Sequence, residues 1–202
     1  TPNCPAALAG AKQITAAYDD FDALAELADA CDVVSYEFEN VNADSVAWLE
    51  ERVYLPQGSQ LLRISQNRLS EKTFLEKLAV PVAPFQKIIT EKDVADAFDM
   101  LGGLILKTVT GGYDGRGQAR ISNTEQIPEA FSVLSQAKTE IVAEQFVKFE
   151  REISVIVARN CLGESRCFTP AENLHKKNIL NISRIPARFQ LIYTYDAADE
   201  QP

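Results

Sequence analysis

A glycine-rich segment spanning residues 104–122 combines residue types that suit phosphate binding. The apolar run Leu104–Leu106 ends on Lys107, and Arg116 lies a few positions further along. The four glycines of the segment fall within seven residues and are Gly111, Gly112, Gly115 and Gly117. Glycine permits positive φ angles, and successive backbone N–H groups in such a loop can form an anion-binding concavity. The segment therefore predicts a β-hairpin whose loop binds phosphate, with Lys107 and Arg116 supplying positive charge.

An ordinary flexible hairpin is the alternative interpretation. The glycine spacing matches neither GxGxxG nor GxxxxGK[ST], so neither common nucleotide-binding fingerprint applies. The segment nevertheless carries an aromatic side chain, an acid and an amide, which are Tyr113, Asp114 and Gln118. A simple turn needs none of them, so the composition favours a binding loop. We expect residues 110–117 to be mobile without ligand and to become ordered with nucleotide.

A second set of polar residues follows a short strand predicted at Asp32–Tyr36. Ligands of open α/β sheets bind at the carboxyl ends of strands, which is where Glu37–Asn40 would lie. A solvated acidic turn is an equal alternative from the residues alone. His175 is the only histidine, which excludes a histidine-rich metal site and argues against a Ser-His-Asp site.

Composition limits the class of protein. The chain has 202 residues, 46% of them hydrophobic, and a formal net charge of −9, which argues against non-specific nucleic-acid binding. No apolar run approaches the ~20 residues of a membrane span, and the first residues do not resemble a signal peptide. The four cysteines show no paired metal spacing. These features predict a cytoplasmic globular protein that does not bind membranes.

Hydrophobic periodicity predicts helices mixed with antiparallel strands. The expected helices are Tyr18–Ala30, Ala43–Arg52, Leu69–Leu78, Glu91–Leu101 and Glu125–Ala137. Further strands are expected at Val53–Leu55, Leu104–Lys107, Ala119–Ser122, Ile141–Val147, Glu152–Arg159 and Arg166–Thr169. The helix at Leu69–Leu78 is expected to bury Leu69, Phe74, Leu75 and Leu78 on one face.

Five stretches together resemble a known family. GGYDGRGQ after Lys107 is similar to the phosphate-covering loop of ATP-grasp enzymes, specifically of the 5-(carboxyamino)imidazole ribonucleotide synthase family. The other similar stretches, in chain order, are Asp32–Val41, Gln66–Phe85, Ile141–Ile156 and Glu172–Leu180. The resemblance implies an α/β (α+β) fold, with a partial Rossmann-like preATP-grasp domain followed by a partial ATP-grasp domain. The C-terminal part of the preATP-grasp domain is expected at 1–64. The ATP-grasp domain is expected at 65–187, where it comprises the central sheet and the start of the second sheet, and residues 188–202 form an atypical tail. It also implies a chain truncated at both ends.

The resemblance also implies the roles of individual residues. Lys107 and Arg116 are expected to be catalytic, and Glu37, Glu39, Tyr113, Asp114 and Arg116 to contact the second substrate. The residues expected at ATP are Arg68, Lys107, Gly112, Tyr113, Asp114, Gly115, Arg116, Gly117, Gln118, Glu144, Gln145, Phe146, Val147, Glu152 and His175. Among these, the segment Glu144–Val147 would meet adenine and Glu152 the ribose, with Glu150 as the alternative. His175 is expected to bind rather than to act as a base.

The implied reaction is ATP-dependent carboxylation of 5-aminoimidazole ribonucleotide with bicarbonate, through carboxyphosphate, in purine biosynthesis. ATP and Mg²⁺ are the expected cofactors, with the metal ligands outside this chain, so these 202 residues alone are expected to hydrolyse ATP negligibly. A homodimer is the oligomer that the resemblance suggests. Two alternatives stay open: another ATP-grasp carboxylate-amine ligase, and a non-catalytic nucleotide-binding or assembly fragment.

Overall fold

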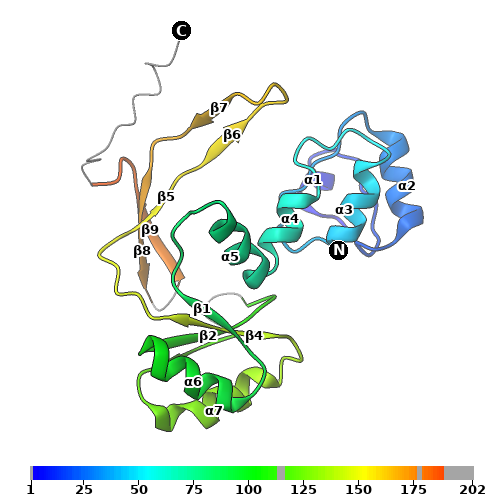
Figure 1. The fold of residues 1–202 in the computed structure, drawn as a ribbon. Helices are drawn as coiled ribbons and strands as arrows, with labels where there is room; N and C mark the ends of the chain where they lie inside the picture. The colour runs from blue at the N-terminus through cyan, green and yellow to red at the C-terminus, as the bar shows by residue number, and fades with distance from the viewer. Residues whose placement is uncertain (1, 113–116, 177–178, 189–202) are drawn as a thin grey trace. The chain divides into compact units, whose positions relative to one another are not determined.

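The computed structural model of the chain separates into two compact units, Thr1–Val147 and Lys148–Pro202 (Figure 1). It describes residues 2–112, 117–176 and 179–188. Over those residues, no helix is long and apolar enough to cross a membrane.

The larger unit begins with a group of short helices. These are α1 (Pro5–Leu8), α2 (Phe21–Ala30), α3 (Ala43–Glu50) and α4 (Gln60–Ser65). Asp20 and Asn42 cap α2 and α3, because their side-chain oxygens accept backbone N–H groups of the first turn. The apolar faces of this group enclose one core, whose buried members are Val34, Val46, Leu49, Leu55 and Leu62.

The strands predicted at Asp32–Tyr36 and Val53–Leu55 are wrong as strands. The two segments meet in one isolated parallel bridge, Val33 to Tyr54, with a hydrogen bond from the Val34 N–H to the Tyr54 carbonyl at 3.0 Å. A strand requires a ladder of such bonds, and among the described residues the bridge does not extend into one. The acidic turn at Glu37–Asn40 therefore follows an extended segment rather than the end of a strand.

Helix α5 (Arg68–Lys77) forms where a helix is predicted, but its expected apolar face is only partly correct. Asn67 caps it by accepting the Ser70 N–H at 2.9 Å. Phe74 and Leu78 are exposed, with 40% and 58% of their surface accessible, and Leu69 and Leu75 are only half-buried. The side of α5 that meets the rest of the unit includes Leu69 and Leu75 together with Lys72, but not Phe74.

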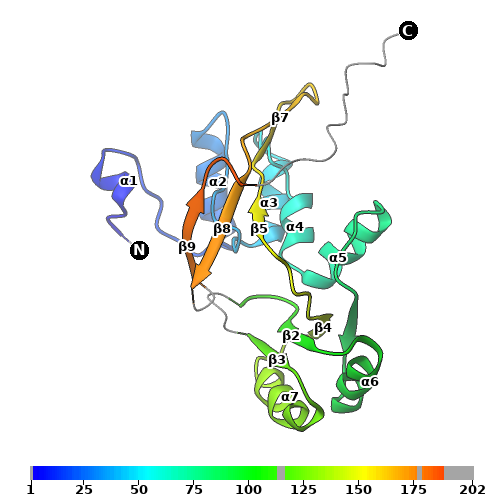
Figure 2. The same cartoon turned by 90° about the vertical axis from the view of Figure 1, so that its left-hand side faces the viewer.

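A four-stranded antiparallel sheet forms the centre of the larger unit. Its strands β1 (Phe85–Ile88), β4 (Ile141–Gln145), β2 (Leu104–Thr108) and β3 (Gln118–Ile121) pair in this spatial order. Helices α6 (Glu91–Leu101) and α7 (Ile127–Ser135), the latter preceded by the 3-10 turn η1 (Thr124–Gln126), cover one face of the sheet (Figure 2). The predicted hairpin of β2 and β3 is confirmed, with Leu104 opposite Ile121 and Lys107 opposite Gln118.

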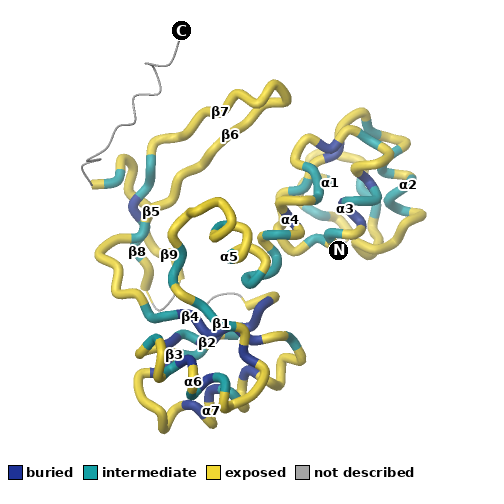
Figure 3. The backbone as a smooth tube through the Cα atoms, viewed as in Figure 1, coloured by how far each residue is buried: buried dark blue, intermediate teal, exposed yellow. Residues whose placement is uncertain are grey.

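The main core lies between this sheet and its two helices (Figure 3). Leu104, Leu106 and Ile121 are completely buried there. Helix α6 begins at a capping box in which the Thr90 side chain accepts the Asp93 N–H and the Asp93 carboxylate accepts the Thr90 N–H. Alternation was expected for Ile141–Val147, but burial is continuous from Ile141 to Glu144, because side chains on both faces of β4 are covered.

The smaller unit consists of short strands. Strands β5 (Glu152–Ser154), β8 (Ala171–Lys176) and β9 (Ile179–Arg184) form one antiparallel sheet, and β6 (Val157–Arg159) pairs with β7 (Ser165–Cys167). The single strand predicted at Glu152–Arg159 is wrong. Its first half pairs with β8 and its second half with β7, so the chain changes partners near Val155.

Candidate functional site

The face of the four-stranded sheet that α6 and α7 leave uncovered carries three of the predicted ATP-binding residues, Lys107, Gln118 and Glu144. Residues that pair directly across strands project to the same face, so the register forms two rows. One row is Phe85, Glu144, Ile105 and Arg120, and the other is Lys87, Val142, Lys107 and Gln118. We call this surface the charged face.

Lys107 lies near the end of β2, beside the glycine segment, as predicted. Its Nζ lies 3.0 Å from Glu144 Oε2, with 25% of the lysine side chain and 10% of the glutamate side chain accessible. Lys72 of α5 approaches the same oxygen at 3.4 Å. Two ammonium groups therefore share one largely buried carboxylate at the mouth of the loop.

Arg68 holds the first part of the glycine segment. Its guanidinium donates to the carbonyls of Thr108 and Gly111 at 2.9 and 2.8 Å, and its backbone N–H donates to the Val109 carbonyl at 3.0 Å. The residue expected at the nucleotide phosphates thus fixes the backbone that leads into the loop. Its predicted phosphate contact stays a prediction.

The backbone conformation at the described loop glycines favours glycine over any other residue. Gly111, Gly112 and Gly117 have φ angles of +69°, +84° and +70°, the left-handed region that side chains disfavour. A Cβ on Gly117 would lie 2.8 Å from Thr108 Oγ1. The predicted roles of Tyr113, Asp114, Gly115 and Arg116, and the expected mobility across them, fall outside the described residues.

The segment expected at adenine follows Glu144. The N–H groups of Gln145 and Phe146 donate to the carbonyls of Pro84 and Gly103 at 2.8 and 2.7 Å, so they are already used within the unit. The predicted contact with adenine would therefore need other groups of the segment, such as the backbone of Val147, and it stays a prediction. The Phe146 ring is covered by the guanidinium of Arg120, 3.8 Å from its centroid.

In the smaller unit, Glu152 and His175 lie close together, and their expected contacts with ATP stay predictions. His175 Nδ1 lies 3.5 Å from Glu152 Oε1, and both side chains are substantially exposed. Asn173 donates to Glu152 Oε1 at 3.4 Å and to Ser154 Oγ at 3.2 Å, and accepts from Ser183 Oγ at 2.9 Å. The amide orients the carboxylate, and sequence reasoning missed it.

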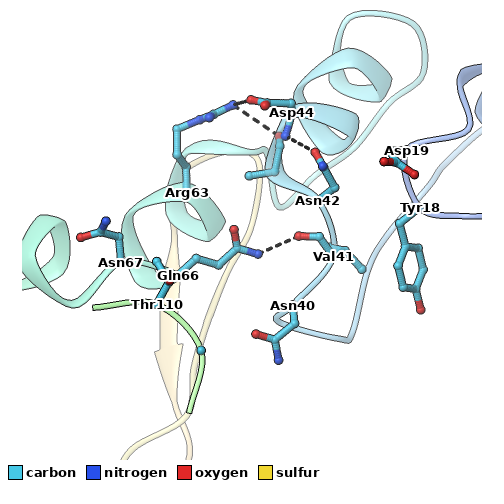
Figure 4. A pocket seen from close by; sticks show the side chains of 12 residues that line it. Tyr18, Asp19, Asn40, Val41, Asn42, Asp44, Arg63, Gln66, Asn67 and Thr110 are labelled. Carbon is cyan, nitrogen blue, oxygen red and sulfur yellow. Dashed lines mark hydrogen bonds and ion pairs between the residues drawn. The ribbon is translucent and has the colours of Figure 1, made fainter. Parts of the chain in front are cut away.

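A polar pocket of about 650 Å³ lies elsewhere in the larger unit (Figure 4). Gln66 donates to the carbonyls of Glu39 and Val41, both at 2.7 Å, and ties α4 to the turn that follows the acidic segment. Further lining groups come from the helical region and from the start of the glycine segment, and include Asn40, Asn42, Arg63, Asn67, Thr110 and Gly111. Pockets of small-molecule size span about 300–1,000 Å³.

The predicted substrate residues Glu37 and Glu39 are exposed and do not line this pocket. The Glu39 carboxylate accepts the Asn40 amide at 3.1 Å, and Asn40 itself faces the pocket. The amides Asn40, Gln66 and Asn67 were missed because amides in loops and at helix ends usually cap backbone groups.

Mg²⁺ has no fitting site among the described residues. No group of three or more His, Cys, Asp or Glu side chains is close enough there to hold a metal ion. The expectation that its ligands lie outside this chain stays a prediction.

Comparison with known proteins gives the class. The ATP-grasp domain family matches residues 73–199, and the ribonucleotide synthetase preATP-grasp domain family matches residues 1–66. The first match spans more than half of the chain, and the chain belongs to the ATP-grasp family. The predicted fold class, a partial preATP-grasp domain followed by a partial ATP-grasp domain, is confirmed.

Individual relatives identify a narrower group within the ATP-grasp family. The chain is 41% identical over 93% of its length to the N5-carboxyaminoimidazole ribonucleotide synthase of Bacillus subtilis (strain 168), and covers 49% of that protein. It is 43% identical over 96% of its length to the synthase of the same name from Brucella melitensis biotype 1, covering 54%. A crystal structure of an N5-carboxyaminoimidazole ribonucleotide synthetase in complex with ADP superposes with a TM-score of 0.88 at 44% identity, over 94% of this chain and 50% of the other. The predicted resemblance is thus confirmed, and the chain spans about half the length of the curated relatives it matches.

Proposed function

We propose that this chain provides the ATP-binding sheet and part of the ribonucleotide site of an enzyme that carboxylates 5-aminoimidazole ribonucleotide. The products would be N5-carboxyaminoimidazole ribonucleotide, ADP and phosphate. The observation that carries the proposal is the placement of Lys107 beside the glycine segment, on a face that also holds Glu144 and Phe146 nearby. The similarity to synthases of this name supports it. We further propose domain limits at 1–64 and 65–187.

Lys107 suits the polyphosphate of ATP. A lysine presents a compact positive charge, and a largely buried setting strengthens its attraction to phosphate oxygens. Gly112 and Gly117 leave room for the loop backbone to approach those oxygens. Phe146 and Val147 offer apolar surface to adenine, and Glu152, oriented by Asn173, can accept the two ribose hydroxyls. His175 would lie beside the same ribose.

The polar pocket near Asn40 suits the ribonucleotide. Its amides can donate to and accept from the imidazole substituents and the ribose, while Arg63 supplies positive charge beside its Asp44 partner at 2.7 Å. Glu37 and Glu39 lie on the exposed turn next to it, and Tyr113, Asp114 and Arg116 belong to the loop that would face this substrate. The start of the glycine segment also lines the pocket, through Thr110 and Gly111.

The chemistry is a phosphoryl transfer followed by a carboxyl transfer. A bicarbonate oxygen attacks the γ-phosphorus, the bond to the ADP oxygen breaks, and carboxyphosphate forms. The amine of the aminoimidazole then takes the carboxyl group, a proton leaves the nitrogen, and phosphate departs. Phosphoryl transfer depends on positioning and charge neutralisation, which is what Lys107 and, by resemblance, Arg116 would supply. Mg²⁺ would neutralise phosphate charge when bound.

The cellular setting follows the same proposal. An enzyme of purine biosynthesis with these small-molecule substrates would act in the cytoplasm, as a homodimer, without nucleic-acid or membrane partners. The net charge of −9 supports the absence of a nucleic-acid role.

Calorimetric titration with ATP tests the binding part of the proposal. We expect ATP to bind the wild-type chain, and the Lys107→Ala variant to bind it more weakly. The reaction is tested with a longer protein that contains this chain and extends it at both ends. The assay measures transfer of labelled bicarbonate to 5-aminoimidazole ribonucleotide. Absence of ATP binding by a folded chain would refute the proposal, while ATP binding without carboxylation by the extended protein would favour another ATP-grasp ligase.

A further inference from the structure

Lys72 of helix α5 is largely buried, whereas Phe74 of the same helix and Leu78 directly after it are exposed. Only 14% of the Lys72 side chain is accessible, whereas Phe74 and Leu78 are 40% and 58% exposed. Lysine is among the residues least often buried unless it is paired. Lys72 therefore lies on the side of α5 that meets the charged face, together with the half-buried Leu69 and Leu75.

The contacts of Lys72 explain that placement. Its Nζ lies 3.4 Å from Glu144 Oε2, the oxygen that Lys107 reaches at 3.0 Å, and 5.5 Å from the centroid of the Phe85 ring. Phe85 and Glu144 are direct neighbours in one row of the sheet. Lys72 thus lies over the same row from the side opposite α6 and α7, and the two lysines converge on one carboxylate.

The charge of this cluster decides how available Lys107 is to a ligand. Two ammonium groups and one carboxylate leave one net positive charge in a setting where screening by water is reduced. Without Lys72, the cluster would be neutral, and Glu144 would attract Lys107 alone. A phosphate group would then compete with Glu144 for a lysine whose charge is already balanced.

We propose that Lys72 is a positioning residue for phosphate binding: by sharing Glu144 with Lys107, it leaves Lys107 free to bind the polyphosphate of a nucleotide. This inference rests on the proposed function, since it assumes that Lys107 meets phosphate. It assigns Lys72 no direct contact with the ligand.

The competing explanation is a purely structural ion pair. An ion pair that only anchors α5 would stabilise the fold, and its loss would lower the free energy of unfolding without changing the ATP affinity of the molecules that remain folded. The two explanations differ in whether neutralising Glu144 restores what the loss of Lys72 removes.

Calorimetric titration with ATP separates them, using the variants Lys72→Met, Lys72→Arg and the double variant Lys72→Met/Glu144→Gln. Lys77→Met, an exposed lysine in the last turn of the same helix, is the matched control. Urea denaturation of each variant identifies effects on folding. If Lys72→Met is not folded, Lys72→Gln makes the same change in charge.

We expect Lys72→Met to weaken ATP binding about tenfold, which corresponds to about 1.4 kcal/mol. Lys72→Arg and Lys77→Met should bind nearly as the wild type does. The double variant should recover much of the loss, because one net positive charge returns to the cluster. Tripolyphosphate, which lacks adenine and ribose, should show the same pattern.

Two results would overturn the inference while leaving the proposed function intact. One is wild-type affinity in Lys72→Met, and the other is a loss in Lys72→Met that the double variant does not reduce. A folded wild-type chain that binds neither ATP nor tripolyphosphate would instead refute the proposed function, and the inference with it.

Discussion

The two faces of the four-stranded sheet carry side chains of different chemistry, apolar on one face and partly charged on the other. The face under α6 and α7 carries Leu104, Leu106 and Ile121, all without accessible surface. The opposite, charged face carries Lys107 and Glu144 in an ion pair that a second lysine shares. Because both faces are formed by alternate residues of the same strands, one register fixes both. The comparison indicates that the helix-covered face stabilises the fold, whereas the charged face carries the groups proposed to bind nucleotide.

The largest effect expected from this division is on stability. Leu106→Ala removes a fully buried side chain from the helix-covered face and should lower the free energy of unfolding by about 2–5 kcal/mol. Urea denaturation measures this change. The molecules that remain folded should keep their ATP affinity, and a loss of stability well below 1 kcal/mol would contradict the assignment of the core.

The next effect is on binding. Lys107→Ala should weaken ATP binding by about 1–3 kcal/mol, the range for losing a hydrogen bond to a charged group. Lys87→Ala is the matched control, because Lys87 lies in the same row of the charged face but pairs with the exposed Glu140. Calorimetry on both folded variants gives the comparison. Equal losses in the two variants would show that the face attracts nucleotide only by its overall charge.

The glycine segment allows a test at the junction between strand and loop. Gly117→Ala should cost about 1–2 kcal/mol for the left-handed backbone, plus a clash with Thr108, whose Oγ1 would lie 2.8 Å from the new Cβ. Gly111→Ala carries the same backbone strain but meets open space, so it should cost less. Urea denaturation of the two variants measures the loss in free energy of unfolding. An equal loss in both would contradict the close approach of Thr108 to Gly117.

The smallest effect concerns the start of α6 on the helix-covered face. Hydrogen bonds from the backbone N–H groups of Thr90 and Ile89 lower the pKa of Asp93 from its ordinary value of 3.8. A lowered pKa in the folded state stabilises the fold above that ordinary value, and the benefit disappears as the pH falls through the folded-state pKa. Asp93→Asn should therefore be less stable than the wild type at neutral pH.

Urea midpoints measured from pH 7 downward should show the difference between Asp93→Asn and the wild type narrowing below about pH 3.8. A difference that stays constant over this range would mean that the ionised carboxylate contributes nothing to α6.

Much of the four-stranded sheet could be predicted from the sequence, because the apolar patterns and turn residues of its segments match the contacts that they make in the fold. The apolar run before Lys107 and the glycines after it define the β2–β3 hairpin, and hydrophobic periodicity defines α6. The segment at Asp32–Tyr36 has the same apolar character but lacks a neighbouring ladder among the described residues, so the pattern alone predicted a strand there.

The residues that complete the site could not be predicted, since their partners are distant in sequence. Lys72 meets Glu144 across 72 positions, and nothing in the pattern of α5 distinguishes it from Lys77. Gln66 and Asn173 likewise act on groups more than 20 positions away, at Glu39 and at Glu152. Family resemblance indicated the residues expected to touch ATP, but not the residues that hold them in place.

The central claim, that nucleotide binds the charged face, is tested most directly by two neighbouring residues that lie on opposite faces. Ile105 pairs with Glu144 and Arg120 on the charged face, while Leu106 is buried under α6 and α7. Methyl NMR spectra recorded during titration with ATP report on both side chains in one sample. The claim predicts that ATP shifts the Ile105 resonance strongly and leaves the Leu106 resonance nearly unchanged. Saturating ATP that leaves the Ile105 resonance in place, or shifts both residues equally, would contradict it.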